Sequence, residues 1–347
     1  MRAALQVGYG SPETSLRISD VPTPSPGAGH VLVRVRHTTL NRKDLFALQN
    51  LSGPGIRPRP PLPHVNGTDC VGEVAEAGAG VTDWAAGDRV VVYGGLYCAG
   101  CEYCLREEHT ACVHYGVVGE QTWGSHAEYV SVPARNLERV PTGTDLAALA
   151  CVGGSWTTAW RALVTVARVQ PGETVLIVGA SGGVGSGAIQ IAKLAGCRVI
   201  AVVGAEWKKH RALELGVEGA VEYGAGGFRQ AVLDATGGRG VDVVLDSVGA
   251  ATWRESITSM RPFGRMAVCG ATSGDGPDIS IREVYQHHRQ ILGAPMGNRH
   301  DFRQLLASVL DGRLRPVIHA TIPLDDIHRG LRLLDDRAFF GKIVLTA

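Results

Sequence analysis

The segment 174–196, TVLIVGASGGVGSGAIQIAKLAG, joins a continuous apolar run, a glycine-rich turn and an amphipathic helical pattern. Gly179, Gly182 and Gly185 are spaced three apart, and Gly183 lies between the last two. Glycines let the backbone approach a pyrophosphate at a helix N-terminus, where free N–H groups and the helix dipole favour anions. Because the turn follows a strand and opens a helix, it predicts a dinucleotide-binding site; a glycine-rich turn without a ligand is the alternative.

Apolar runs continue at short intervals beyond this turn and alternate with segments of helical length. Such alternation predicts βαβ units on a parallel sheet with helices on both faces. The N-terminal 150 residues are instead rich in Val, Gly and Pro, and their short β-type runs are separated by turn clusters, which predicts a β-rich domain. From about residue 296 we expect a helix, a β run, a second helix and a terminal strand, GKIVLTA. The alternating runs are 173–180, 198–204, 242–249 and 265–271.

Composition excludes several function classes. The chain is 45% hydrophobic and 19% charged, and its formal net charge is +1, so no field favours nucleic acid or an anionic membrane. No apolar run approaches the roughly 20 residues that span a bilayer, and the N-terminus lacks the pattern of a signal peptide. We therefore expect no nucleic-acid or membrane partner. Four cysteines scattered in apolar segments fit a reducing interior, and a cytoplasmic location is expected.

A cysteine cluster is the strongest local motif. Cys98, Cys101, Cys104 and Cys112 fall within the segment CAGCEYCLREEHTAC. Four thiolates around a tetrahedral Zn²⁺ leave no open position for water or substrate, which predicts a structural metal. Ligation by four cysteines also suits an iron–sulfur cluster, which is the rival interpretation.

The end of the second alternating run bears on the choice of dinucleotide. NAD-binding proteins place an Asp or Glu there for the ribose hydroxyls, but this chain has Val203 followed by Gly204. The absence of an acid favours NADPH over NADH. Lys208, with Lys209 and Arg211 nearby, is the candidate cation for a 2′-phosphate; a solvated helix face is the alternative.

Several motifs in order resemble the medium-chain dehydrogenase/reductase superfamily, and within it the quinone oxidoreductase-like branch. They include TTLNRKDL, PHVNGTDCVGEV, SHAEYVSVP, SWTTAWRAL and the glycine turn. The resemblance implies a GroES-like β-rich catalytic domain and a Rossmann domain with a doubly wound parallel sheet. It implies zinc at the cysteine cluster. The expected boundaries are 1–155 for the catalytic domain with a zinc lobe at about 95–115, 156–295 for the Rossmann domain, and 296–347 for a return to the catalytic domain.

Zinc-dependent alcohol dehydrogenases of this superfamily hold a second, catalytic zinc. Its ligand positions are occupied here by Asn41, Thr68 and Gly154, which do not bind zinc as thiolates and imidazole do. The sequence therefore predicts that the catalytic zinc is absent. An unorthodox site is the alternative, built from His64, Asp69, Cys70 and Cys151.

The resemblance then implies hydride transfer without a catalytic metal. The expected activity is NADPH-dependent reduction of a quinone or an activated C=C bond in an enal, enone or enoyl thioester, because the resulting delocalised charge can be held by modest donors. One alternative is an alcohol dehydrogenase with atypical metal ligands. Another is a cofactor-binding regulatory protein without turnover. A homodimer or homotetramer acting on a small electrophile is expected.

Matching positions give the candidate site residues. Asn41 and Thr68 are the expected polarising donors, and Asp44 is expected to orient the loop or a cofactor hydroxyl. His64, Trp123 and Trp156 are candidate pocket residues, with core packing as the alternative for the tryptophans. The expected cofactor-binding residues are Thr158, Gly179, Ser181, Gly182, Gly183, Val184, Gly185, Gly204, Lys208, Tyr223, Ser247, Val248, Ala271 and Lys342.

Overall fold

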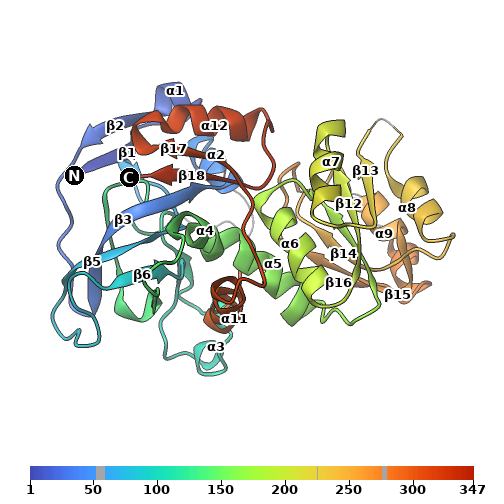
Figure 1. The fold of residues 1–347 in the computed structure, drawn as a ribbon, viewed down its shortest axis with the longest axis horizontal. Coiled ribbons are helices and arrows are strands. Elements are labelled where there is room, and N and C mark those ends of the chain that lie inside the picture. Colours follow the sequence, from blue (N-terminus) through green and yellow to red (C-terminus); the bar gives the residue numbers. More distant parts are fainter. Residues whose placement is uncertain (52–58, 225, 276–279) are drawn as a thin grey trace. The chain divides into compact units, whose positions relative to one another are not determined.

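The computed structural model describes residues 1–51, 59–224, 226–275 and 280–347, and these residues form two compact units (Figure 1). The first unit comprises Met1–Gly154, Asn298–Leu310 and Ile318–Ala347, and the second comprises Ser155–Gly297 and Asp311–Val317. The sequence predicted one continuous return of 296–347 to the first unit. Residues 311–317 group instead with the second unit, where Arg315 exchanges two hydrogen bonds with the Gln190 side chain.

A seven-stranded sheet organises the first unit, in the order β10-β6-β5-β3-β18-β17 with β9 also paired to β3. The C-terminal strands therefore lie beside an N-terminal one, as the red and blue ribbons of Figure 1 show. A three-stranded sheet, β2-β1-β4, and the β7–β8 pair complete the β structure of the described part of this unit. The strands are β1 (Arg2–Gln6), β2 (Leu16–Asp20), β3 (His30–Leu40), β4 (His64–Val65), β5 (Val71–Ala77), β6 (Arg89–Val92), β7 (Gly95–Leu96), β8 (Gly116–Val117), β9 (Tyr129–Pro133), β10 (Leu137–Arg139), β17 (Ile318–Pro323) and β18 (Lys342–Thr346).

Alternating side chains bury one face of this sheet. Val31, Val33 and Val35 of β3 pack in one core, whereas Arg34 and Arg36, on either side of Val35, are exposed, as a period of two requires. A second core lies under α12 and includes side chains of β3 and β18. The helices of the unit are α1 (Pro12–Ser15), α2 (Arg42–Leu48), α3 (Glu102–Leu105), α4 (Leu146–Ala150), α11 (Arg299–Leu310) and α12 (Ile327–Asp335), with short 3₁₀ turns at His109–Ala111, Ala134–Asn136 and Leu324–Asp326.

The second unit contains a six-stranded parallel sheet in the order β13-β12-β11-β14-β15-β16, which is the doubly wound dinucleotide-binding order. The predicted fold class, a GroES-like domain plus a Rossmann-type domain, is confirmed. The strands are β11 (Thr174–Val178), β12 (Arg198–Val203), β13 (Gly219–Glu222), β14 (Val241–Asp246), β15 (Met260–Val268) and β16 (Gln290–Gly293). The helices are α5 (Thr157–Trp160), α6 (Gly183–Leu194), α7 (Glu206–Glu214), α8 (Arg229–Ala235), α9 (Trp253–Thr258) and α10 (Ile281–Tyr285), and the π-helical turns Val152–Trp156 and Arg161–Val166 flank α5.

No helix in the described part of the chain is both long and apolar enough to cross a membrane.

Helix α6 packs closely on the segment that precedes it. A Cβ placed at Gly187 would lie 2.9 Å from the nearest atom of the fully buried Trp156 indole. Gly187 is therefore required by packing, because a buried ring in a dense core has little room to move.

We predict that Gly187→Ala lowers the free energy of unfolding by about 1–2 kcal/mol, although alanine ordinarily stabilises a helix relative to glycine. Urea unfolding measures the change. Gly219→Ala is the control, because a Cβ at Gly219 meets no atom within 4 Å. Equal or greater stability of Gly187→Ala would contradict the packing argument.

Candidate functional site

A buried polar network lies where β3 ends and β18 begins. The Asp69 carboxylate is fully buried, and its Oδ2 accepts hydrogen bonds from the Thr39 hydroxyl, from Asn41 Nδ2 at 2.9 Å and from Lys342 Nζ at 3.3 Å. Lys342 is 2% exposed. Since an isolated buried ion is costly, each charge here depends on the other and on the neighbouring dipoles.

Lys342 commits all three of its ammonium protons within this network. Nζ donates to Asn41 Oδ1 at 2.7 Å, to Leu40 O at 3.2 Å and to Asp69 Oδ2 at 3.3 Å. An ammonium group has three donors and no acceptor. The structure therefore gives Lys342 partners other than the cofactor phosphates that the resemblance implied.

Asn41 and Asp44 shape the start of α2. Asp44 Oδ2 accepts the Asn41 N–H at 2.7 Å, and the Asp44 N–H returns a bond to Asn41 O at 2.9 Å. Asp44 is buried, and its Oδ2 lies 4.0 Å from Nε2 of the buried His126. These contacts fix the loop that carries Asn41, which accords with an orienting role for Asp44.

Thr68 and His64 point their polar atoms at one backbone segment. Thr68 Oγ1 donates to Val118 O at 2.7 Å, and His64 Nε2 lies 3.1 Å from Gly119 O. The Thr68 hydroxyl proton is thus committed, and Thr68 offers a ligand only oxygen lone pairs, contrary to its expected role as a donor. Burial lowers the pKa of His64, and its Nδ1 is buried without a hydrogen-bond partner.

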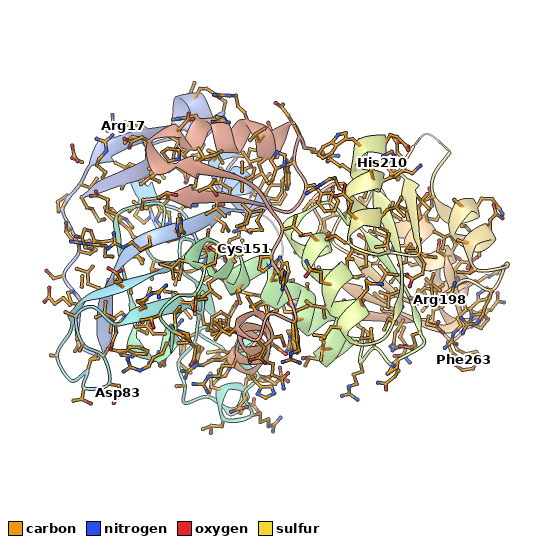
Figure 2. The ribbon with its side chains drawn as sticks, viewed as in Figure 1. Arg17, Asp83, Cys151, Arg198, His210 and Phe263 are labelled. Atoms are coloured by element: carbon orange, nitrogen blue, oxygen red, sulfur yellow. The ribbon has the colours of Figure 1, made fainter. Side chains whose placement is uncertain are left out.

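At Gly154, the third predicted catalytic-zinc position, a side chain would press on the Asp69 carboxylate. A Cβ at Gly154 would lie 2.9 Å from Asp69 Oδ1, which is itself buried without a hydrogen-bond partner. Cys151, labelled in Figure 2, follows α4, and burial raises the pKa of its thiol to about 12. Burial also raises the pKa of the Cys70 thiol. Among the described residues, the alternative set of His64, Asp69, Cys70 and Cys151 does not form a metal-ligating group.

The two candidate pocket tryptophans lie in different surroundings. Trp156 is fully buried against Gly187, so its place is in the core of the second unit rather than in a pocket wall. Trp123 is 36% exposed and lines a hollow of about 310 Å³ in the first unit, together with His30 and Tyr129.

The cysteine cluster is preformed for a metal. The Sγ atoms of Cys98, Cys101, Cys104 and Cys112 all lie within 4.8 Å of one another. Backbone N–H groups, first that of Cys104, lower the pKa of Cys101 to about 6, whereas desolvation and neighbouring thiols raise that of Cys104 to about 12. A thiol with a raised pKa, such as that of Cys104, needs a nearby cation to be a thiolate at neutral pH. A tetrahedral Zn²⁺ with no open position fits the four sulfurs.

The metal lobe is tied to α11 by contacts that sequence patterns did not reveal. Asn298 Nδ2 donates to Glu108 Oε2 at 2.8 Å, and its Oδ1 accepts the Thr110 N–H at 3.1 Å. The Arg299 N–H, at the start of α11, lies 3.4 Å from His109 Nδ1. The lobe is therefore held by the C-terminal part of the chain as well as by its metal.

The glycine turn fits a pyrophosphate. Gly179 has a φ of +78°, and a Cβ on Gly185 would overlap the Gly179 carbonyl, so both positions require glycine. Gly182 is the N-cap of α6, and as a glycine it has no side chain to accept hydrogen bonds from the first turn. The first turn begins with Gly183 and Val184, and its N–H groups are therefore available to an anion. Ser181 immediately precedes this cap.

Other predicted cofactor residues surround the same edge of the sheet. A Cβ on Gly179 would lie 3.0 Å from Ser247 Oγ and from Val248 Cγ2, and one on Gly249 would lie 2.8 Å from Ala271 Cα. These residues therefore meet at the carboxyl ends of the strands, where this fold binds dinucleotides.

The remaining cofactor candidates are more scattered. Tyr223 is 40% exposed and donates to Ala251 O at 3.1 Å, and Thr158 is buried in α5. Gly204 is exposed, and a Cβ there would meet no atom within 4 Å. Lys208 is 5% exposed, and its Nζ lies 5.3 Å from the Trp207 ring centroid, so it does not lie on a solvated helix face, which was the alternative to its predicted role as the cation for a 2′-phosphate.

These features define a two-domain oxidoreductase that depends on a nicotinamide dinucleotide. Residues 183–311 match the zinc-binding dehydrogenase family, and residues 27–142 match the alcohol dehydrogenase GroES-like domain. The chain belongs to the medium-chain dehydrogenase/reductase superfamily; the comparisons do not specifically support its quinone oxidoreductase-like branch.

Similar proteins carry two kinds of name. The chain is 32% identical to an acryloyl-coenzyme A reductase of Metallosphaera sedula, over 100% of both chains. It is also 32% identical to an NAD-dependent alcohol dehydrogenase of Sulfolobus acidocaldarius, over 99% of both. Among solved structures, an NAD-dependent alcohol dehydrogenase matches with a TM-score of 0.93 and 38% identity, over 100% of both chains.

We predict that Cys112→Ser removes the bound zinc and lowers Tm by about 5 °C or more, because the metal orders a lobe with little core of its own. Native mass spectrometry and thermal unfolding measure the two effects. Cys197→Ser is the control, since that cysteine donates to Gln170 O in the second unit and should leave zinc bound. Full zinc content in Cys112→Ser would contradict the assignment.

Proposed function

We propose that this protein uses NADPH to reduce an activated C=C bond, with a small enoyl thioester as the substrate class. The proposal rests chiefly on the three catalytic-zinc positions, where Asn41, Thr68 and the side-chain-free Gly154 replace metal ligands. The similarity to acryloyl-coenzyme A reductases supports the thioester class.

Hydride addition to such a substrate requires stabilised negative charge rather than a strong Lewis acid. NADPH, when bound, would supply a hydride to the β-carbon; the displaced π electrons would pass to the thioester oxygen, and the α-carbon would take a proton from water. Asn41 is held by Asp44, Asp69 and Lys342, and it offers the forming enolate oxygen an N–H donor. Thr68 and Asp44 fix the loops around this donor.

Oxidation of an alcohol at an atypical metal site is the second candidate. By identity the comparisons favour it, since the solved NAD-dependent alcohol dehydrogenase is 38% identical and the Metallosphaera sedula reductase 32%. The buried, unpartnered His64 Nδ1 is the side-chain atom that favours it. Quinones are the other predicted acceptors of the first class, but none of the relatives named above is called a quinone reductase. The homodimer or homotetramer stays a prediction.

The two candidates make opposite predictions about metal. We expect one zinc per chain and NADPH-dependent reduction of acryloyl or crotonyl thioesters, with no chelator-sensitive oxidation of alcohols. Metal analysis of the purified protein and absorbance assays of NADPH consumption measure both. Two zinc ions per chain together with alcohol oxidation would exclude the first candidate.

NADPH is the proposed cofactor because the residue after β12 is Gly204, which leaves open space and places no carboxylate at that position. Lys209, in the N-terminal half of α7, carries a positive charge near Gly204 in the sequence, and its Nζ pairs with the Glu206 carboxylate at 3.0 Å.

We predict that Gly204→Asp shifts the preference between NADPH and NADH by at least about tenfold toward NADH, because the new carboxylate repels a 2′-phosphate and can bind ribose hydroxyls. The ratio of kcat/KM values measures the shift. Gly204→Asn, of similar size and without charge, is the matched control. A wild-type preference for NADH would contradict the proposal.

A further inference from the structure

The amide of Asn41 can face its neighbours in one orientation only. Lys342 Nζ, which lies 2.7 Å from one end of the amide, has donors alone, so that end is the carbonyl oxygen. The Asp69 carboxylate, which lies 2.9 Å from the other end, accepts, so that end is the NH₂ group. The buried ion pair therefore locks the amide without any help from a ligand.

Both charges polarise the amide in the same direction. A cation at the oxygen and an anion at the N–H favour the resonance form with negative oxygen and positive nitrogen, and hydrogen bonds in such a chain strengthen one another. The ammonium makes its shortest contact with this oxygen, 2.7 Å against 3.3 Å to the carboxylate. One Nδ2 hydrogen is used by Asp69, and the second has no acceptor among the described residues.

We propose that Lys342 is a positioning residue that acts through Asn41: its buried ammonium strengthens the free Nδ2–H as the donor to the substrate oxygen that becomes negative. This inference rests on the proposed function and adds to it the source of positive charge. The charge reaches the substrate through an amide, so Lys342 need not touch substrate or cofactor.

A double-mutant cycle tests whether Lys342 acts through Asn41. We expect Asn41→Ala to lower kcat for enoyl-thioester reduction about 100-fold and Lys342→Met to lower it about tenfold. In the Asn41→Ala background, Lys342→Met should cost less than about twofold more, because the amide that it polarises is gone. Lys193→Met, which removes a lysine paired with Glu218 at 3.9 Å, is the matched control and should leave kcat unchanged.

Two further measurements separate this role from a structural one. Lys342→Met leaves the buried Asp69 carboxylate unpaired, which can destabilise the fold. The double variant Asp69→Asn/Lys342→Met removes that charge as well. Its Tm should stay near that of the wild type, and its kcat should still fall about tenfold. In spectra of protein labelled with ¹⁵N-asparagine, the Asn41 side-chain amide should shift in Lys342→Met and stay near its wild-type position in Lys342→Arg.

The outcomes separate a failure of the inference from a failure of the proposed function. The inference is wrong, and the proposed function stands, if the wild type reduces the thioester but the kcat losses of Asn41→Ala and Lys342→Met multiply in the double variant. The same holds if the Asn41 amide signal does not shift in Lys342→Met. If the wild type reduces no activated alkene, the proposed function fails and the inference fails with it.

Discussion

The buried ion pair between Asp69 and Lys342 is the interaction on which the first unit most depends. The two charged groups lie 3.3 Å apart, with side chains 0% and 2% exposed. Desolvating two ions costs several kcal/mol each. This cost is offset by hydrogen bonds from Thr39 and Asn41 to Asp69 Oδ2 and from Lys342 to the Leu40 carbonyl, whereas Asp69 Oδ1 has no partner among the described residues. Removal of either partner would leave an uncompensated charge, typically a loss of about 3–5 kcal/mol.

This pair constrains the chain well beyond its own residues. Lys342 is the first residue of β18, so the ammonium reaches Asp69 only if β18 lies against β3, as the register of Leu40 opposite Ile343 achieves. On the other side, the uncommitted Asp69 Oδ1 occupies the space that a side chain at Gly154 would need. A metal ligand at position 154 would therefore require a change at Asp69, and Asp69 in turn requires Lys342.

Local patterns predicted much of the fold and part of the site. The glycine turn and the cysteine cluster each lie within a short segment, and spacing alone fixes which backbone or sulfur atoms converge. The Asp69–Lys342 pair joins residues 273 positions apart, and nothing in either neighbourhood names the partner. A lysine in the otherwise apolar GKIVLTA and an aspartate beside buried strand residues were the available signal, since charges in such runs are seldom buried unpaired. For Trp156 the sequence left a pocket wall and core packing both open, because its packing on Gly187 depends on how two helical segments meet.

The amount of charge at the network decides which chemistry it can support. An alkoxide concentrates a full negative charge on one oxygen, and a divalent metal meets that demand as a Lewis acid. A thioester enolate spreads its charge over oxygen and carbon, so an amide donor backed by one buried ammonium is a sufficient match. The network holds one ammonium group, which it shares between the Asn41 amide and the Asp69 carboxylate, and under the proposed function this ammonium serves the enolate through the amide. In the proposed function, the residues at the three predicted catalytic-zinc positions and the burial of Lys342 therefore belong to one electrostatic arrangement.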